Sequence, residues 1–265
     1  MSRELPHGQF MGTINRSVSA GGFDVDLRVA TLPPEAVEEH SHGAAHFILP
    51  LADGYRSLAR DPLSRRTVFG AGSALYNPPG VVHRDCFDVP GGLFLSVTAP
   101  SDLPTARDRP VLLRGPAECA MHRLVGLSLR GRSSDGLLVE DAAHILAGAV
   151  SDEPDPSRHA PDWLPLAMEI VDDLSLSAGL EVRDVAARVR VHPVHLARAW
   201  RRHLGRSPGS AIRHRRAQHA AIHLARDLPL AEVAASAGYA DQSHMTREYA
   251  RIFGVTPGVF RAAVA

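Results

Sequence analysis

Four histidines in the first hundred residues are spaced so that their imidazole rings can meet in one cavity. In an extended strand, residues two positions apart face the same side, so His40 and His42 share a face. His46 can reach that cavity across the next turn, and the tight corner at residues 78–80 directs His83 inward. Neutral imidazoles are good ligands for zinc, nickel, copper or iron. The same rings can instead line a polar effector pocket or pack against helices, and the sequence leaves these alternatives open.

The arginines of the C-terminal third are a second group with a chemical use. Residues 181–265 contain 14 arginines and 6 acidic residues, a net charge of +8. Residues 1–180 contain 15 arginines and 23 acidic residues, a net charge of −8. A basic segment inside a chain of zero net charge predicts contact with a polyanion such as a nucleic acid. Chance clustering of charge is the simpler alternative.

Two stretches of this basic region resemble each other and would position its arginines. Asp184-Val185-Ala186 recurs 48 residues later as Glu232-Val233-Ala234. Each copy predicts a short amphipathic helix, a tight turn and a second helix, which is the order of a helix-turn-helix unit. We expect Pro193 to open the second helix of the first copy, Gly238 to end the first helix of the second copy, and Asp241 to cap the helix that follows. An ordinary helical bundle with a solvated basic face is the alternative.

The second helix of each copy has one apolar face and one face that can contact DNA. The residues expected to point inward are Leu196, Trp200 and Leu204 in the first copy and Met245, Tyr249 and Phe253 in the second. In a major groove, arginine can fork onto guanine and glutamine onto adenine, whereas Val194 and Ala197 can contact only a thymine methyl group. The expected DNA-contacting residues are Val194, His195, Ala197, Arg198, Arg201, Arg202, Gln242, Ser243, Thr246, Arg247 and Arg251. The arginines expected to neutralise phosphates without reading sequence are Arg201, Arg202, Arg206, Arg215, Arg216 and Arg251.

The order of residues near the C-terminus is itself distinctive. Residues 238–247 read Gly-Tyr-Ala-Asp-Gln-Ser-His-Met-Thr-Arg, and Gly254-Val-Thr-Pro257 and Phe260-Arg261 follow. Together with the first copy from Asp184 to Pro208, these motifs resemble the AraC-type transcription regulators over about residues 163 to 263. The resemblance implies that each second helix enters a major groove and that a long central helix, at about Ala211 to Arg226, joins the two units. His192 departs from the serine that usually caps the first recognition helix, which implies a less sharply set helix.

The histidines also belong to longer motifs. His40-Ser-His42 is followed by a segment in which Gly72, Pro78, Gly80 and His83 have the order Gly-x5-Pro-x-Gly-x2-His. These motifs resemble those of the cupin barrels, with two departures: His46 stands in place of a glutamate and Phe87 in place of an asparagine. In metal-bearing cupins these positions hold one divalent ion. The ligands that the resemblance implies are His40, His42, His46 and His83. Many AraC-type sensors keep the barrel without a metal, so an effector cavity without one is the alternative.

Strand and helix patterns predict the elements that hold these groups. Residues 23–29 alternate apolar and polar as in a half-buried strand, and many such short strands predict a sandwich or barrel. Apolar residues recur at helical spacing between 117 and 150. The predicted fold is an α+β multidomain chain. It has a cupin-like effector-sensing barrel over 10–115, a helical dimerisation region over 116–150, a proline-containing linker over 151–161 and an all-α AraC-type DNA-binding domain over 162–263. The helix-turn-helix units of that last domain are expected at about 180–204 and 230–253.

Composition and missing motifs exclude other classes. A hydrophobic content of 45% and a charged content of 22% are those of a folded chain. The sequence has no apolar run of the roughly 18 residues that a membrane span needs and no signal-peptide pattern, and Cys86 and Cys119 cannot form a disulfide framework, so we expect a cytoplasmic protein. Glu38, Glu39 and Asp85 have no distinguishing spacing, and the sequence contains neither a phosphate-binding loop nor a nucleophile elbow. We therefore expect no enzyme.

The sequence thus predicts a sequence-specific transcription regulator that binds double-stranded DNA, responds to a small-molecule or metal effector and forms a homodimer. A divalent transition metal in the barrel is the one cofactor that it suggests. The alternative is a cupin-type metalloenzyme with an accessory DNA-binding module. An RNA- or protein-interaction module is disfavoured, because the free helix faces carry no aromatic residues for base stacking.

Overall fold

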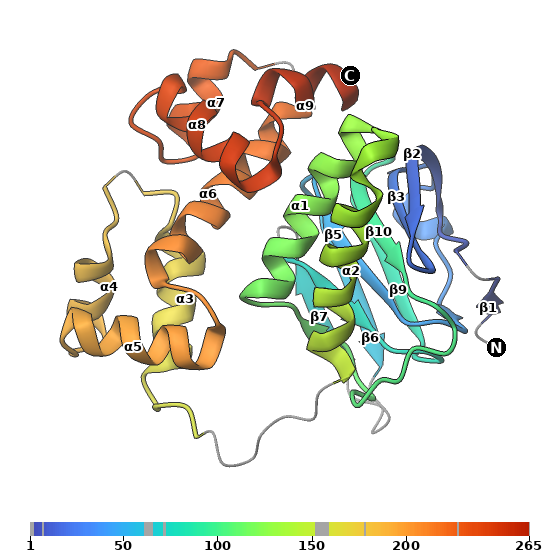
Figure 1. The fold of residues 1–265 in the computed structure, drawn as a ribbon, viewed down its shortest axis with the longest axis horizontal. Helices are drawn as coiled ribbons and strands as arrows, with labels where there is room; N and C mark the ends of the chain where they lie inside the picture. The colour runs from blue at the N-terminus through green and yellow to red at the C-terminus, as the bar shows by residue number, and fades with distance from the viewer. Residues whose placement is uncertain are drawn as a thin grey trace.

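A computed structural model describes residues 3–6, 8–60, 66–70, 73–151, 159–177, 179–226 and 228–264 (Figure 1). For residues 3, 60 and 66–70 it describes the backbone alone. Gly72 of the expected barrel motif and most of the expected linker, residues 152–158, lie outside the described residues.

The N-terminal part contains two sheets. The strands are β1 (Arg3–Leu5), β2 (Gly12–Ala20), β3 (Phe23–Ala30), β4 (His40–His42), β5 (His46–Pro50), β6 (Tyr55–Arg60), β7 (Arg66–Gly70), β8 (Leu75–Asn77), β9 (His83–Phe87), β10 (Leu93–Thr98) and β11 (Val111–Leu112). One sheet has the order β1-β4-β9-β6-β7 and the other the order β11-β8-β5-β10-β3-β2. β4 and β9 of the first sheet face β5 of the second, since the rings of His42 and His46 lie 4.3 Å apart between centroids.

Two helices cover the outer face of the six-stranded sheet. α1 (Pro116–Arg130) and α2 (Gly136–Ser151) form an antiparallel hairpin, as expected from the helical spacing. α1 ends at Gly131, which adopts a left-handed backbone conformation with φ of 56°. Both helices contact β2, and α1 also contacts β3 (Figure 1). The hairpin therefore lies between the sheets and the rest of the chain.

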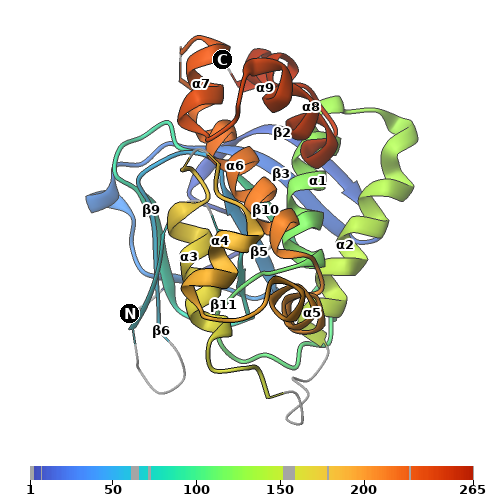
Figure 2. The same cartoon turned by 90° about the vertical axis from the view of Figure 1, so that its left-hand side faces the viewer.

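The C-terminal part is helical throughout its described residues. Its helices are α3 (Leu164–Leu174), α4 (Val182–Arg188), α5 (Pro193–Leu204), α6 (Pro208–Leu224), α7 (Leu230–Ser236), α8 (Gln242–Phe253) and α9 (Pro257–Val264). We call α4 with α5 the first helix pair and α7 with α8 the second. The pairs lie at opposite ends of α6 in both views (Figures 1 and 2). The central helix begins at Pro208 rather than at the expected Ala211, because Ser207 caps it and proline is well suited to the first helical position.

The two helix pairs differ in whether their hydrophobic core is continuous with that of the N-terminal unit. Residues of α3, α4 and α5 form a separate hydrophobic cluster with the start of α6, around Trp200. The apolar residues of α7, α8 and α9 instead belong to one continuous core with α1, α2 and the six-stranded sheet. The second helix pair is thus docked on the N-terminal unit by apolar contact.

A glycine makes this docking close. A Cβ atom added at Gly126 of α1 would lie 1.5 Å from the carbonyl oxygen of Phe253, the last residue of α8. No side chain larger than a hydrogen atom fits there without movement of one helix.

The division into a sheet-rich N-terminal part and a helical C-terminal part is confirmed. The expected half-buried strand at 23–29 is present as β3, but both of its faces are buried. Asp26 and Arg28 point into the space between the sheets, where they pair at 2.5 Å, and Arg28 also donates to Ser96 at 3.0 Å. The alternation is real, but its polar residues face an interior polar site instead of solvent.

Candidate DNA-binding surface and histidine site

The turns of the two helix pairs have the same backbone geometry. Val191 N–H donates to Ala186 C=O at 3.0 Å in the first turn, and Tyr239 N–H donates to Ala234 C=O at 2.9 Å in the second. The positive φ of 74° expected at Gly238 is present. The corresponding position of the first turn, 48 residues earlier, is Arg190, which adopts a φ of 56°. The repeated sequence therefore folds into a repeated turn.

Side-chain caps fix where each second helix begins. The Asp241 carboxylate accepts the backbone N–H of His244 at 2.7 Å, as expected. His192 caps α5 more weakly, because its Nδ1 accepts the N–H of Val194 at 3.3 Å. α5 ends at Gly205 and α8 ends at Gly254, and both glycines adopt a left-handed backbone conformation.

The inward faces of α5 and α8 are those predicted, since Leu196, Trp200, Met245, Tyr249 and Phe253 are buried. The opposite faces lie in solvent. The exposed residues on them are Val194, His195, Arg198, Arg201 and Arg202 on α5 and Gln242, Ser243, Arg247 and Arg251 on α8, and Ala197 and Thr246 are half-buried among them. Two contacts limit their use: Thr246 Oγ1 donates to Gln242 C=O at 2.8 Å, and the His195 ring lies 5.4 Å from the Trp163 ring.

Three arginines expected at phosphates have partners inside the molecule instead. Arg206 binds the Glu118 carboxylate at 2.6 Å, and Arg215 binds Asp172 at 3.0 Å. Arg216 donates to the carbonyl oxygens of Ser175 and Ser177. The sequence could not distinguish these arginines from those on α5 and α8, because their acidic and carbonyl partners lie 39 to 88 residues away along the chain.

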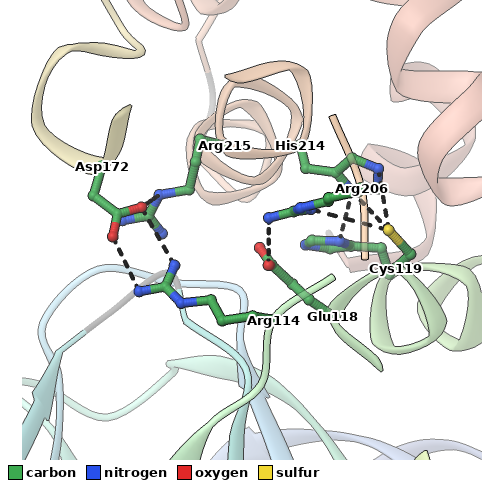
Figure 3. Close-up of polar contacts among 8 residues, drawn as sticks. Arg114, Glu118, Cys119, Asp172, Arg206, His214 and Arg215 are labelled. Atoms are coloured by element: carbon green, nitrogen blue, oxygen red, sulfur yellow. Dashed lines mark hydrogen bonds and ion pairs between the residues drawn. The ribbon is translucent and has the colours of Figure 1, made fainter. Parts of the chain in front are cut away.

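Figure 3 shows the polar contacts that join the two parts of the molecule. Arg114, just before α1, and Arg215, on α6, both contact the Asp172 carboxylate of α3. On the next turn of α1, Cys119 Sγ lies 3.5 Å from His214 Nε2, and the Nδ1 atoms of His214 and His122 are 3.2 Å apart. Burial, followed by the neighbouring arginines, lowers the pKa of His214 to about 3. These contacts tie α1 to the start of α6.

The four predicted histidines meet between the sheets, and all four are buried. His40, His42 and His83 each offer a ring nitrogen within 4.8 Å of the others. The Nδ1 atoms of His40 and His83 contact the carbonyl oxygens of Glu38 and Val81 at 2.9 and 3.0 Å, an outer contact that also orients metal-binding imidazoles. Within the described residues, Nε2 of His42 and Nε2 of His83 have no hydrogen-bond partner, and Oδ2 of Asp85 lies 3.9 Å from the latter.

His46 holds a different place in this cluster. Its Nε2 lies 3.1 Å from Nδ2 of Asn77. Its ring can share a metal ion with His83 and Asp85, but it is not part of the group formed by His40, His42 and His83. Burial is the main cause that lowers the pKa of His42, to about 3, and of His46. Their rings are therefore neutral near pH 7 and have lone pairs available for a metal or a hydrogen-bond donor.

A second set of groups, which the histidine spacing did not predict, lies beside the histidines. Arg28 lies over the Phe10 ring at 4.9 Å, and Phe10 in turn contacts the ring of His42 at 4.8 Å. The signal was the polar half of the alternation in β3, which placed Asp26 and Arg28 on one face. That face lines the histidine site.

Residues 185–263, less than a third of the chain, match a family model described as a helix-turn-helix domain. These residues form an AraC-type helix-turn-helix domain. The matched part of the chain is thus a DNA-binding helix-turn-helix domain. No curated protein matches this chain.

Solved structures that are similar to parts of this chain include three with an informative description. The C-terminal domain of AraT, a response regulator from Geobacillus stearothermophilus, is 27% identical over 40% of this chain and 88% of its own, with a TM-score of 0.38. The DNA-binding domain of AdpA in complex with a target DNA is 24% identical over 39% of this chain and 93% of its own, with a TM-score of 0.36. ToxT K231A from Vibrio cholerae is 11% identical over 93% of this chain and 99% of its own, also with a TM-score of 0.36. TM-scores this low do not establish a common fold.

In the part of the chain that the structure describes, none of the helices combines the length and apolar content needed to cross a bilayer.

Proposed function

We propose that this chain is an effector-responsive transcription regulator in which each helix pair is a helix-turn-helix unit and α5 and α8 enter major grooves of one duplex. The observation that carries the proposal is the pair of exposed, arginine-bearing faces at opposite ends of α6. α6 has 17 residues and is therefore about 26 Å long. That length suits neighbouring major grooves on one side of a duplex, which are about 34 Å apart.

The repeat suggests a role for each exposed arginine. Arg198 and Arg247 occupy equivalent positions near the middle of α5 and α8, where a side chain reaches base edges, and we assign both to guanine. Arg202 and Arg251 lie one turn further along, with Arg201 beside the former, and we assign these three to phosphates. Gln242 and Ser243 begin α8, where the N-terminal turn of a recognition helix reads bases.

Two substitutions test this assignment against an operator obtained by selection from random DNA. Arg247→Ala should weaken operator binding by about 1–3 kcal/mol and relax the preference at one base pair. Arg202→Ala should weaken all sequences equally and reduce the salt slope by about 1. Titration of both variants over a panel of single-base operator changes separates the roles. Equal, sequence-independent losses in both variants would reject the base-reading role of Arg247.

We propose that the two sheets form a cupin-like sensor barrel whose histidine site takes a metal or a small effector. The residues fit a divalent transition ion: three buried imidazoles converge, and the Nε2 atoms of His42 and His83 have no hydrogen-bond partner among the described residues. His40, His42 and His83 would hold the ion, with His46 and Asp85 as an adjoining pair. Elemental analysis of untagged protein grown with added metal tests this assignment. A stoichiometry near zero in the wild type, equal to that of a His83→Asn variant, would leave an organic effector as the ligand.

We further propose that the α1–α2 hairpin mediates homodimerisation over the predicted region 116–150. Leu137 and Ile145 are exposed on one face of α2, 80% and 38% respectively, with Gly148 beside them. Two such faces can bury each other in a symmetric interface. Sedimentation of the wild type and of Ile145→Asp measures the oligomeric state, and a monomeric wild type at operator-saturating concentrations contradicts the interface.

An effector would regulate DNA affinity only by the difference between its affinities for two arrangements of the units.

A further inference from the structure

A cleft of about 430 Å³ lies in the seam between α1 and the helices α6 and α8. It is separate from the histidine site, which lies between the sheets. Its walls come from both parts of the molecule: Arg123 and Arg130 from α1, Ser210 and Arg213 from α6, and Arg251 from α8. Cys119 and His214, the contact shown in Figure 3, form part of its lining.

The charges that surround the cleft do not cancel. Arg123 and Arg130 contact Asp141 and Asp135, and Arg213 and Arg251 share the single carboxylate of Glu248. Four guanidinium groups thus face three carboxylates, which leaves one positive charge in excess. The side chains of Arg123, Arg130, Arg213 and Arg251 are 44%, 29%, 45% and 70% exposed, so a ligand that enters from solvent can reach all four.

The guanidinium groups also keep donors for a ligand. Each has five N–H donors, and the ion pair to Glu248 or to an aspartate uses one nitrogen at 2.9 to 3.3 Å. Nε of Arg130 lies within ion-pair distance of Asp135 but has no aligned hydrogen-bond partner among the described residues. A bound carboxylate or sulfonate would provide acceptors for these donors.

The other part of the cleft is apolar. Leu138 of α2 and Ile252 and Phe253 of α8 belong to its lining. Leu138 is 38% exposed, so its side chain is accessible to a ligand in the cleft. An excess of one positive charge next to an apolar wall fits a monoanion with an apolar body.

We propose that this cleft binds an organic monoanion, a carboxylate or sulfonate carried on an apolar group, and that the bound anion holds α8 against α1. The ligand would contact both units, so it would stabilise the docked arrangement over any other. Arg251 lies both in the cleft and on the proposed DNA-binding face, so the ligand would also change the contact of this arginine with phosphate. This last consequence rests on the proposed function, whereas anion binding does not.

Fluorescence titration of the full-length chain with 8-anilinonaphthalene-1-sulfonate, in the absence of DNA, tests the site. We expect one saturable site per chain. Arg213→Gln should weaken the probe about tenfold, the value of one charge-assisted contact. Arg183→Gln is the matched control, because Arg183 is 73% exposed on α4, pairs with Glu181 and lies outside the cleft. Equal affinities in the wild type, Arg213→Gln and Arg183→Gln would overturn the proposal.

A second pair of variants guards against an unfolded Arg213 variant. Ser210→Asp places a carboxylate in the cleft and in the first turn of α6, where a negative charge suits the helix. Ala231→Asp makes the same change in the first turn of α7, away from the cleft. Only Ser210→Asp should reduce probe binding, and equal reduction or none in both contradicts the site.

Competition defines the ligand class. 4-Phenylbutyrate should displace the probe, and 4-phenylbutan-1-ol, which has the same apolar body without the charge, should not. Displacement by both would overturn the assignment of a monoanion. Operator titrations run in parallel distinguish the two proposals. If Arg213→Gln or Ser210→Asp loses probe binding but keeps its operator affinity, the cleft proposal and the proposed function are both supported. If the wild type binds the probe but binds no DNA, the proposed function is refuted and the cleft proposal is not.

Discussion

Substitution of Gly126 by alanine tests whether α8 is docked on α1 as tightly as the structure indicates. The new Cβ atom would lie 1.5 Å from the carbonyl oxygen of Phe253 and 2.7 Å from its carbonyl carbon. Atoms of this kind do not approach closer than about 3.0 Å, so one helix must retreat by about 1.5 Å. α1 lies on the sheet and α8 in the continuous core, which leaves little space for that movement.

The expected magnitude follows from two opposing effects. Alanine in a helix interior is favoured over glycine by about 1 kcal/mol. Overpacking of a well-packed interface costs about 1–3 kcal/mol or more, and here the obstacle is backbone rather than a flexible side chain. We expect a net loss of about 1–2 kcal/mol in the free energy of unfolding, together with faster amide exchange in α8.

Gly148→Ala is the matched control. Gly148 lies in α2 and a Cβ atom added there has nothing within 4 Å, so this variant should gain up to about 1 kcal/mol from helix propensity. Urea unfolding of both variants measures the difference, expected at about 2–3 kcal/mol. Equal stabilities of Gly126→Ala and Gly148→Ala, with unchanged exchange in α8, would refute the close docking of the two helices.

Three further predictions concern other contacts. Arg190→Gly should raise the free energy of unfolding by about 1 kcal/mol, because it removes a side chain from a left-handed backbone position. Arg188→Gly, which places a glycine within α4, should lower the free energy of unfolding by a similar amount. Urea titration measures both variants. Burial holds the folded-state pKa of His214 near 3, below an unfolded value of about 6.5, so the contribution of His214 to stability should be nearly complete at pH 7 and fall by about 2 kcal/mol between pH 7 and 5. His214→Asn should reduce that pH dependence, and an unchanged slope contradicts the assignment. Glu118→Ala should lower the free energy of unfolding by about 3–5 kcal/mol, because the Arg206 guanidinium stays buried without its carboxylate partner. Adding Arg206→Met should recover part of this loss, and thermal unfolding of the single and double variants measures both effects.

The features that depend on residues close together in the chain were predictable from the sequence. The cap at Asp241 depends on a hydrogen bond that spans three residues, and the inward face of α8 depends on helical periodicity within twelve residues. The turn of the second pair was predictable for the same reason, since a glycine stands at the position that needs a positive φ. The first turn has Arg190 there, so its type could be known only from the alignment of the two copies.

Where the outcome depended on distant residues, the sequence was not sufficient. Arg202 and Arg206 are alike in type and neighbourhood, yet one is exposed and the other pairs with Glu118 on another unit. The polar residues of β3 alternate as on a solvated sheet, but a second sheet closes over them. The histidines converge as their spacing predicted, whereas the pairing of His46 with Asn77 depends on the register of β5 with β8.

The unequal docking of the helix pairs determines which of them can move at lower cost. The second pair shares a core with α1 and the sheet, so its release exposes apolar surface to water. The first pair has its own core and meets the N-terminal unit at a smaller contact, made by the ion pairs of Arg114 with Asp172 and of Glu118 with Arg206 and by the end of α5, where a Cβ atom added at Gly205 would lie 2.7 Å from Pro116 Cδ. Water and salt can replace part of the half-buried Arg114–Asp172 pair, whereas separation of the buried Glu118–Arg206 pair is costly. Movement of the first pair therefore exposes less apolar surface than release of the second, and its main cost lies in the Glu118–Arg206 pair. Because the ligand cleft is walled by α6 and α8, an anion bound there would act on the docked second pair.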